Sequence, residues 1–303
     1  MFYFTNNSLC EFFVKSFIFT TNSKTQIVMT INCHGQLIDL TIPKVMGILN
    51  ITPNSFYDGG TYFDEKSILK QVKKMLEEGA TFIDIGAYSS KPKADFVSEE
   101  EELLRLIPVI TLVLKHFPET LISVDTFRSH VAKVAVENGA CMINDISAGN
   151  LDPKMMETVA NLHVPYIMMH MKGTAETMQS LVQYENLIKE MLLFFSEKVA
   201  QARSLGIHDL IIDPGFGFAK TLGQNFELLN NLELFQILEL PVLVGVSRKS
   251  MIYKTLNTLS EFAGNGTTVL NTIALLKGTK ILRVHDVKEA VECLQLTNKL
   301  RDS

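Results

Sequence analysis

The sequence predicts an α/β protein in which eight strand–helix units close into a barrel. Short apolar runs alternate with longer amphipathic segments eight times between residue 44 and the end of the chain. Short apolar runs separated by helical segments are typical of strands buried on both faces of a parallel sheet. Similar glycine-centred turns join predicted helices to the next predicted strands: Glu78-Gly79-Ala80, Asn138-Gly139-Ala140, Leu205-Gly206-Ile207 and Lys277-Gly278-Thr279.

The predicted strands are apolar and most end at a polar residue. In the first, Val45 to Leu49 is apolar, Asn50 follows, and the loop beyond it is rich in turn-forming residues such as Pro53 and Gly59. Each strand should therefore deliver a polar side chain and a loop to the same end of the sheet. The eight strands are predicted at 44–50, 81–85, 121–125, 141–144, 165–169, 210–213, 241–245 and 280–284.

The segments between these strands have helical periodicity and recognisable ends. Gly79 is placed to end the first helix, and Ser98 and Glu101 have the spacing of a capping box at the start of the second. The third helix is expected to end near Asn138 and Gly139. The first two helices are predicted at 65–78 and 98–116, and those after the third at 152–161, 182–205, 222–238, 249–257, 265–277 and 286–300.

Eight parallel units in about 260 residues match a closed (β/α)8 barrel, the TIM barrel. A doubly wound open sheet is the alternative, but it usually has fewer strands and a glycine-rich first turn, which this chain lacks. Residues 27–31 and 37–42, joined around His34 and Gly35, predict a β-hairpin that closes the bottom of the barrel. No change in composition marks a second domain, so we expect residues 27–303 to form a single domain.

Residues 1–26 are expected to be a leader that is disordered or that precedes the true translation start at Met29. The stretch from Leu9 to Thr20 is apolar and aromatic, but Glu11 and Lys15 interrupt it. It is too short to span a bilayer, and it lacks the basic segment and cleavage site of a signal peptide. A membrane anchor is the alternative interpretation.

The net charge and the cysteine content limit the kinds of molecule that the protein is expected to bind. The net charge of −5 gives no overall attraction to nucleic acid or to an anionic membrane, so neither is an expected partner. The four cysteines form no CxxC pair, which favours reduced thiols and a cytoplasmic location. The expected partners are therefore small-molecule substrates.

In a barrel of this kind the carboxyl ends of all strands meet at one mouth. Lys249, Arg283 and His285 come from the last two units, the usual phosphate corner of the fold, and suit a pyrophosphate group. A single polar strand end has an ordinary structural interpretation, since Asp125 and Asp286 could cap helices. Polar residues at all eight strand ends favour a binding or catalytic role over a purely structural one. These residues are Asn50, Asp84, Asp125, Asn144, His170, Asp213, Ser247-Arg248-Lys249, and Arg283 with His285.

Carboxylates and amides lie at the ends of strands three, four and six. Asp125, Asn144 and Asp213 suit a flat heterocycle rich in N–H donors, such as an aminopyrimidine ring. Asn50 offers a neutral oxygen that suits Mg²⁺ shared with a phosphate, the usual way this ion binds weakly to protein. The chain has no HExxH motif, which argues against a zinc site made by protein ligands alone.

Several motifs together resemble the dihydropteroate synthase family over the chain from Lys44 to its C-terminus. Any one of them is weak evidence, but seven in the same order, each at a strand end, are specific. They are Leu49-Asn-Ile-Thr-Pro-Asn-Ser-Phe56 with Asp58-Gly-Gly60, Ser123-Val-Asp-Thr126, Ile143-Asn-Asp145, Met169-His-Met171, Asp213-Pro-Gly-Phe-Gly-Phe218, Ser247-Arg-Lys249 and Arg283-Val-His-Asp-Val287.

The resemblance implies a homodimeric, magnesium-dependent transferase of folate biosynthesis that is the target of sulfonamides. Such an enzyme joins 6-hydroxymethyl-7,8-dihydropterin pyrophosphate to p-aminobenzoate. It implies catalytic roles for Asp125, Asp213, Lys249, Arg283 and His285. By position, the resemblance implies that the pterin is held by Asp125, Asn144, Asp213 and Lys249, with Met168 lining its pocket. The pyrophosphate would be held by Asn50 with Mg²⁺, and by Lys91, Arg283 and His285. The p-aminobenzoate would be held by Ser90, Pro92, Phe218, Ser247 and Lys249.

The second loop departs from the family pattern, which commonly reads Gly-Gly-Glu-Ser-Thr-Arg-Pro. Here Tyr88 stands at the glutamate position and Ser90 at the threonine position, while Lys91 keeps a charge but lacks the two-pronged geometry of arginine. Two alternative functions stay open at this point. One is a non-catalytic pterin-binding paralogue, and the other is a methyltetrahydrofolate-dependent methyltransferase, which has no use for the Ser247-Arg248-Lys249 run.

Overall fold

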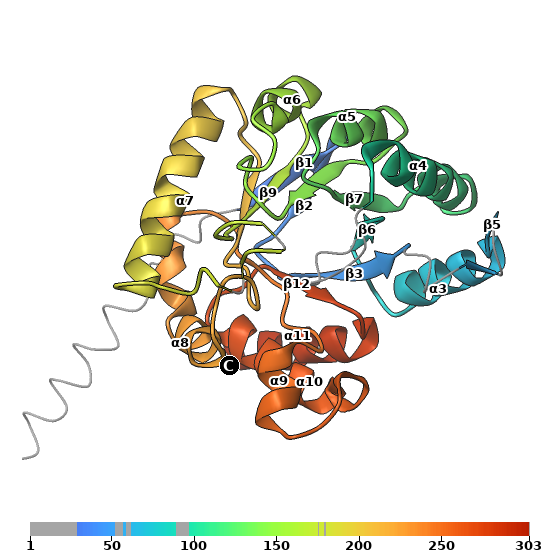
Figure 1. Ribbon diagram of the computed structural model, residues 1–303. Helices are drawn as coiled ribbons and strands as arrows, with labels where there is room; N and C mark the ends of the chain where they lie inside the picture. Colours follow the sequence, from blue (N-terminus) through green and yellow to red (C-terminus); the bar gives the residue numbers. More distant parts are fainter. Residues whose placement is uncertain are drawn as a thin grey trace, which may run out of the picture.

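Eight parallel strands form the barrel of the computed structural model, with helices around it (Figure 1). Hydrogen bonds join the strands in the order β10-β9-β8-β7-β6-β3-β12-β11, and a parallel bridge between Ile212 and Val242 joins the two outermost strands. The predicted (β/α)8 barrel is therefore confirmed. The strands are β3 (Lys44–Asn50), β6 (Phe82–Gly86), β7 (Leu121–Asp125), β8 (Met142–Asp145), β9 (Tyr166–Met169), β10 (Leu210–Asp213), β11 (Leu243–Val244) and β12 (Ile281–Val284).

The structure describes residues 29–51, 57–58, 62–88, 97–174, 176–178 and 180–302. The predicted leader and the second-loop residues Ser90, Lys91 and Pro92 lie outside these ranges. No helix within them is long and apolar enough to cross a membrane.

The helices lie close to their predicted positions. Ser98 caps the second one as expected, because its Oγ accepts a hydrogen bond from the Glu101 amide at 3.2 Å. The helical elements are α3 (Glu65–Glu77), α4 (Glu99–His116), α5 (Ser129–Glu137), α6 (Met155–Leu162), α7 (Leu187–Ser204), α8 (Leu222–Asn230), α9 (Ser250–Thr255), α10 (Gly264–Leu276) and α11 (Val287–Asp302), with the 3₁₀ helices η1 (Leu232–Leu238) and η2 (Ser260–Phe262).

Two helices differ from the prediction. Helix α7 begins at Leu187 instead of residue 182, because the Asn186 side chain caps it by accepting a hydrogen bond from the Lys189 amide at 2.9 Å. The predicted helix 222–238 breaks at Asn231, whose side-chain amide donates to the Glu227 carbonyl at 2.8 Å, and continues as η1. Both differences arise from asparagine side chains that form hydrogen bonds with the backbone.

The loop after β3 also contains structure that the sequence analysis did not predict. Its short strands β4 (Tyr57–Asp58) and β5 (Tyr62–Phe63) pair antiparallel, with Tyr57 opposite Phe63.

Side chains alternate between the barrel interior and the helix layer, as the pleat of a strand requires. Ile83 and Ile85 of β6 pack with helix residues such as Ile68 and Val72, in the core between the barrel and its helices. Phe82 belongs instead to an inner cluster at the bottom of the barrel. This alternation decides which residues of each strand can reach the mouth.

The predicted hairpin closes the bottom of the barrel. Strands β1 (Thr30–Cys33) and β2 (Gln36–Asp39) pair antiparallel around His34 and Gly35, both of which have positive φ. Apolar hairpin side chains pack into the inner cluster with residues from the barrel strands. The members of this cluster are Ile31, Cys33, Ile38, Leu40, Met46, Phe82, Cys141, Met142, Ile167, Ile211, Leu243 and Ile281.

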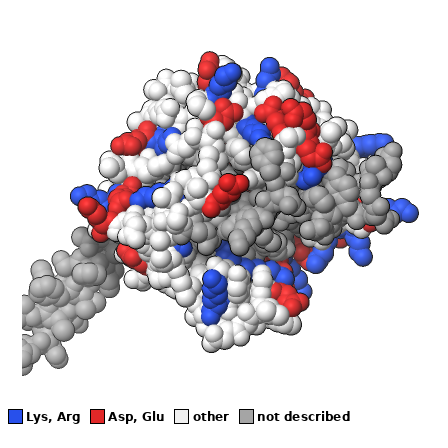
Figure 2. Space-filling view, viewed as in Figure 1, with Lys and Arg blue, Asp and Glu red and all other residues white. Residues whose placement is uncertain are grey.

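Acidic and basic side chains are interspersed on the face drawn in Figure 2, and neither sign gathers into one broad patch.

Leu40→Ala tests the role of the hairpin. Leu40 is fully buried, so its truncation should lower the free energy of unfolding by about 3 kcal/mol, as expected for a leucine removed from a packed core. Leu37→Ala in the same hairpin is the control and should change it by about 0.5 kcal/mol or less, because that side chain is 70% exposed. Chemical denaturation of both variants measures the difference. Equal losses would show that the hairpin does not pack as a plug.

Candidate active site

Polar side chains from four strands meet inside the upper barrel, around Arg283. The Arg283 Nε donates to Asp84 Oδ2 at 2.6 Å, and its Nη2 donates to Asp125 Oδ2 at 2.8 Å. Asn144 donates its side-chain amide to the same Asp84 oxygen at 3.1 Å. Residues that are far apart in the sequence thus converge at one site, as predicted.

Strand alternation explains why these side chains point inward. Ile83 and Ile85 flank Asp84, and Leu282 and Val284 flank Arg283; all four pack in the outer core between barrel and helices. The residue between each pair must then face the barrel axis. The apolar helix layer therefore fixes the direction of the charged groups.

The predicted division into an acidic side and a basic side is not kept. Barrel closure places β12 next to β3, and β3 next to β6 and then β7. Arg283 therefore reaches across β3 to the carboxylates of Asp84 and Asp125. The guanidinium of Arg283 thus lies against two carboxylates, which lowers the cost of burying these charges.

The buried environment changes the pKa values of this cluster. Although burial alone lowers the pKa of Arg283, the carboxylates of Asp84 and Asp125 raise it above its usual value. Burial raises the pKa of Asp125 from 3.8 to about 7; Arg283 opposes this rise and Asp84 adds to it. Arg283 is thus always a cation, whereas Asp125 can gain or lose a proton near neutral pH.

Lys249 forms the second part of the site, beside the loop that follows β10. Its Nζ donates a hydrogen bond to the Phe216 carbonyl and lies 4.9 Å from the centroid of the Phe218 ring. Burial lowers the pKa of Lys249 to about 8, while the negative charge of Asp213 partly restores it. Asp213 itself is anchored, because its Oδ1 accepts from the Gly215 amide at 2.8 Å.

His285 and Ser247 lie at the rim and are hydrogen-bonded to each other. The Ser247 Oγ accepts from the His285 amide at 3.2 Å and lies 3.0 Å from His285 Nδ1. Arg248, between Ser247 and Lys249, does not join this cluster. Its guanidinium instead forms two hydrogen bonds with the Asp286 carboxylate, at 2.9 and 2.6 Å. Asp286 directly precedes α11, where its backbone carbonyl accepts from the Ala290 amide at 3.3 Å, and its carboxylate binds Arg248.

Met168 does not line the mouth, and this prediction is wrong. It shares the outward parity of Tyr166 in β9 and is fully buried in the core between barrel and helices. The next residue, Met169, points to the mouth side and belongs to an apolar cluster with Ile146 and Phe218. An error of one residue along a strand reverses the face on which a side chain lies.

Two other polar residues near strand ends have structural roles. The Asp145 carboxylate accepts hydrogen bonds from the amides of Ser147 and Gly149 and from the Tyr166 hydroxyl, so it fixes the turn after β8. His170 points outward from the end of β9 toward α7, where its ring meets Phe194 edge-on at 4.9 Å.

Asn50 ends β3 at the mouth, opposite Gly86 of β6, and is exposed. The described part of the chain contains no group of three or more His, Cys, Asp or Glu side chains arranged to hold a metal ion. A neutral, exposed amide oxygen without carboxylate neighbours of that kind fits an ion whose other ligands come from a phosphate and from water.

A family model for pterin-binding enzymes matches residues 46–285. Dihydropteroate synthase of Haemophilus influenzae is 43% identical over 270 residues, which cover 88% of this chain and 98% of the relative. The chain belongs to the dihydropteroate synthase family. The Escherichia coli K12 enzyme is 42% identical over 88% of this chain and 95% of its own length.

Solved structures of the family have the same fold. A Yersinia pestis dihydropteroate synthase, solved in a sulfonamide complex, superposes with a TM-score of 0.85 at 39% identity and covers 91% of this chain and all of its own. The Xanthomonas albilineans enzyme with 7,8-dihydropteroate gives a TM-score of 0.81 at 36% identity, with the same coverage of the two chains. The protein is accordingly a transferase with the dihydropteroate synthase fold.

Asp84 was predicted to lie at the mouth but without a role, and Lys220 was not predicted from the sequence. Asp84 is fully buried and its Oδ2 serves both Arg283 and Asn144, so it orients two site residues of this family member at once. Lys220 is buried behind the loop that carries Phe218. Both Asp84 and Lys220 are charged residues within apolar stretches that contain glycine, and this pattern could have indicated from the sequence that they are buried.

Asp84→Asn should destabilise the protein and disorder the site. An asparagine amide removes the negative charge that compensates the buried Arg283, a change that costs about 3 kcal/mol for buried pairs. Glu77→Gln is the control, since its 3.7 Å pair with Lys73 is exposed on α3 and should contribute about 0.5 kcal/mol or less. Thermal and urea unfolding compare the two variants. A loss from Asp84→Asn no larger than that of the control would refute the anchoring role.

Asp125 should titrate near neutral pH. Its raised pKa means that the native state binds more protons than the unfolded chain between pH 3.8 and about 7. Its contribution to stability is therefore fully present below pH 3.8 and is lost as the pH rises through about 7. Carboxyl carbon NMR measures the titration; Asp152, whose pKa lies below the usual range, serves as an internal reference. An Asp125 midpoint as low as that of Asp152 would contradict the assignment.

Proposed function

We propose that this chain condenses 6-hydroxymethyl-7,8-dihydropterin pyrophosphate with p-aminobenzoate to give 7,8-dihydropteroate and pyrophosphate. The observation that carries the proposal is the convergence of Asp125, Asn144 and Arg283 inside one barrel mouth, with Asp213 and Lys249 beside them. The related Xanthomonas enzyme has been solved with 4-aminobenzoic acid and with 7,8-dihydropteroate, which supports the same substrates here.

The pterin ring is assigned to the carboxylate and amide groups. Its ring N–H and amino groups need acceptors, and Asp125, Asn144 and Asp213 supply them in a buried setting where such hydrogen bonds are strong. Lys249 donates to the acceptor side of the ring, and Met169, in place of Met168, packs against its face. The raised pKa of Asp125 implies that pterin affinity increases as this carboxyl loses its proton.

The pyrophosphate is assigned to Asn50, Arg283 and His285, with Lys91 of the second loop. Arg283 is held by two carboxylates in the unliganded site, so it can redirect part of its charge toward an arriving anion. We propose that Asn50 holds Mg²⁺ together with the substrate phosphates. When bound, this ion neutralises the charge that develops on the leaving group.

The p-aminobenzoate site is assigned to Phe218, Ser247 and Lys249, with Ser90 and Pro92 of the second loop. In the reaction the bond between the pterin methylene carbon and the pyrophosphate oxygen breaks, and both electrons leave with the pyrophosphate. The electron-rich pterin spreads the resulting positive charge. The arylamine nitrogen then attacks the methylene carbon and loses one proton, so the chemistry requires no strong base.

We propose that two copies of the chain pair, and that they work in the cytoplasm. Large apolar side chains are exposed on η2, α10 and α11, a pattern that favours a protein interface. Helices α10 and α11 pack side by side, so these residues form neighbouring parts of the surface. The exposed residues are Leu259, Phe262, Val269, Leu276 and Leu296.

Asp213→Ala tests the pterin assignment. It removes a buried acceptor and should abolish pterin binding, measured by calorimetry with the pterin pyrophosphate and Mg²⁺. Asp209→Ala is the matched control, because it lies just before the opposite end of β10 and contacts the hairpin through the Asn32 amide. It should leave pterin affinity within twofold. Undiminished binding by Asp213→Ala would place the pterin elsewhere.

Genetic complementation separates the enzyme from a pterin-binding paralogue. The wild-type gene should restore growth of a strain that lacks dihydropteroate synthase, and Asp213→Ala should not. Normal expression and intact pterin binding without rescue would favour the paralogue.

A further inference from the structure

The loop of residues 214–220 supports the part of the site that holds Lys249. Its Phe216 carbonyl accepts from Lys249 Nζ, and its Phe218 ring lies against the same ammonium. The loop is tightly wound, with positive φ at Gly215, Gly217 and Ala219. A Cβ atom at Gly215 would lie 2.2 Å from the His170 carbonyl oxygen. Such a backbone requires additional side-chain contacts to keep its shape.

Lys220 supplies these contacts from beneath the loop. Its Nζ donates to the carbonyls of Gly215 and Phe218, both at 3.0 Å, and lies 3.1 Å from Nδ1 of His170. A lysine ammonium has three N–H donors, and here each has one acceptor. The side chain is buried, so water does not compete for these bonds.

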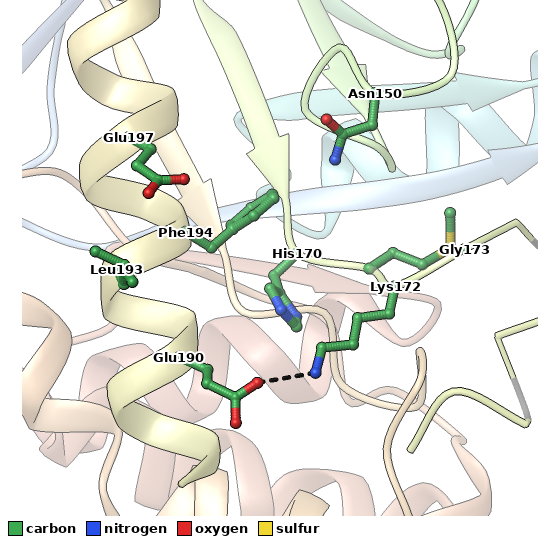
Figure 3. A pocket seen from close by; sticks show the side chains of 9 residues that line it. Asn150, His170, Lys172, Gly173, Glu190, Leu193, Phe194 and Glu197 are labelled. Carbon is green, nitrogen blue, oxygen red and sulfur yellow. Dashed lines mark hydrogen bonds and ion pairs between the residues drawn. The ribbon is translucent and has the colours of Figure 1, made fainter. Parts of the chain in front are cut away.

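His170 is held as the third acceptor by its surroundings. Burial and the nearby Lys220 and Lys172 lower the pKa of His170 to about 2, so the ring is neutral and its Nδ1 can accept a hydrogen bond from Lys220 Nζ. Figure 3 shows the ring between Phe194 of α7 and Lys172, which is paired with Glu190 at 2.9 Å. His170 is therefore one of the residues that line the pocket in this view.

We propose that Lys220 is a positioning residue for p-aminobenzoate: with His170 it fixes the 214–220 loop so that Phe216 and Phe218 hold Lys249 in place. This proposal rests on the proposed function for its substrate. Direct contacts connect Lys220 to Lys249 through Phe218, because Lys220 binds the Phe218 carbonyl and the Phe218 ring contacts the Lys249 ammonium.

The charge state of Lys220 fits this role. Burial lowers its pKa to about 7; Asp213 opposes this shift, while Lys249 and Lys172 add to it, and the facing His170 is neutral. A neutral amine has two donors, so loss of the proton breaks one of the three contacts. The support is therefore complete on the acid side of pH 7 and weakens above it.

Lys220→Met tests the proposal, because it keeps most of the side-chain volume and removes the ammonium. We expect the KM for p-aminobenzoate to rise about tenfold, because a small misplacement of its binding groups Phe218 and Lys249 is costly. The KM for the pterin substrate should change less, because its other binding groups do not depend on the loop in this way. The dependence of the p-aminobenzoate KM on pH near 7 should also weaken. Lys198→Met is the control, since Lys198 on α7 bonds Asn150 and touches no part of the loop.

Two substitutions of His170 provide an independent test if Lys220→Met does not fold. His170→Leu removes one acceptor and should raise the p-aminobenzoate KM about fivefold, the equivalent of one hydrogen bond. His170→Gln keeps a side-chain acceptor and should stay closer to wild type. Equal effects of both substitutions, or a p-aminobenzoate KM within twofold of wild type in Lys220→Met or His170→Leu, would overturn the proposal.

Hydrogen exchange tests the loop support without catalysis. Amides of the loop should exchange faster in Lys220→Met than in wild type, whereas unchanged rates would overturn the proposal. A wild-type protein that exchanges as expected but makes no dihydropteroate would contradict the proposed function alone. A fall in kcat and melting temperature with unchanged KM would show a purely structural lysine, which also overturns the positioning role.

Discussion

The salt bridges that Arg283 makes with Asp84 and Asp125 connect the fold to the chemistry. They span β12, β6 and β7 across the intervening β3, so they form only when the last strand of the barrel pairs with the first. A guanidinium buried without these carboxylates would be strongly unfavourable. Closure of the sheet, burial of charge and assembly of the site are therefore one event.

Much of the architecture could be predicted from local sequence. The glycine-centred turns and apolar runs located eight strands, and polar residues after those runs located the mouth. Side-chain direction was harder to predict, since Met168 and Met169 are chemically identical neighbours that face opposite layers. The start of α7 and the break before η1 depend on asparagine caps, which a periodic pattern does not reveal.

Partners within the site could not be predicted, because they depend on strand order around the closed barrel. Charge type alone grouped Arg283 with Lys249, whereas closure places it between carboxylates. Burial then moves the pKa values of Asp125, Lys249 and Lys220 toward neutrality from opposite directions. Exclusion of water from the site thus makes the charge states of these groups sensitive to small changes in their surroundings.

The hairpin at the bottom of the barrel has a practical consequence for handling the protein. Met29, the first described residue, is tied to this end, since its carbonyl accepts from the Leu40 amide at 2.7 Å. An affinity tag or fluorophore joined just before Met29 would therefore start from the end of the barrel opposite the mouth. Immobilisation through that point should leave the mouth facing solution and suits surface-based screening of inhibitors.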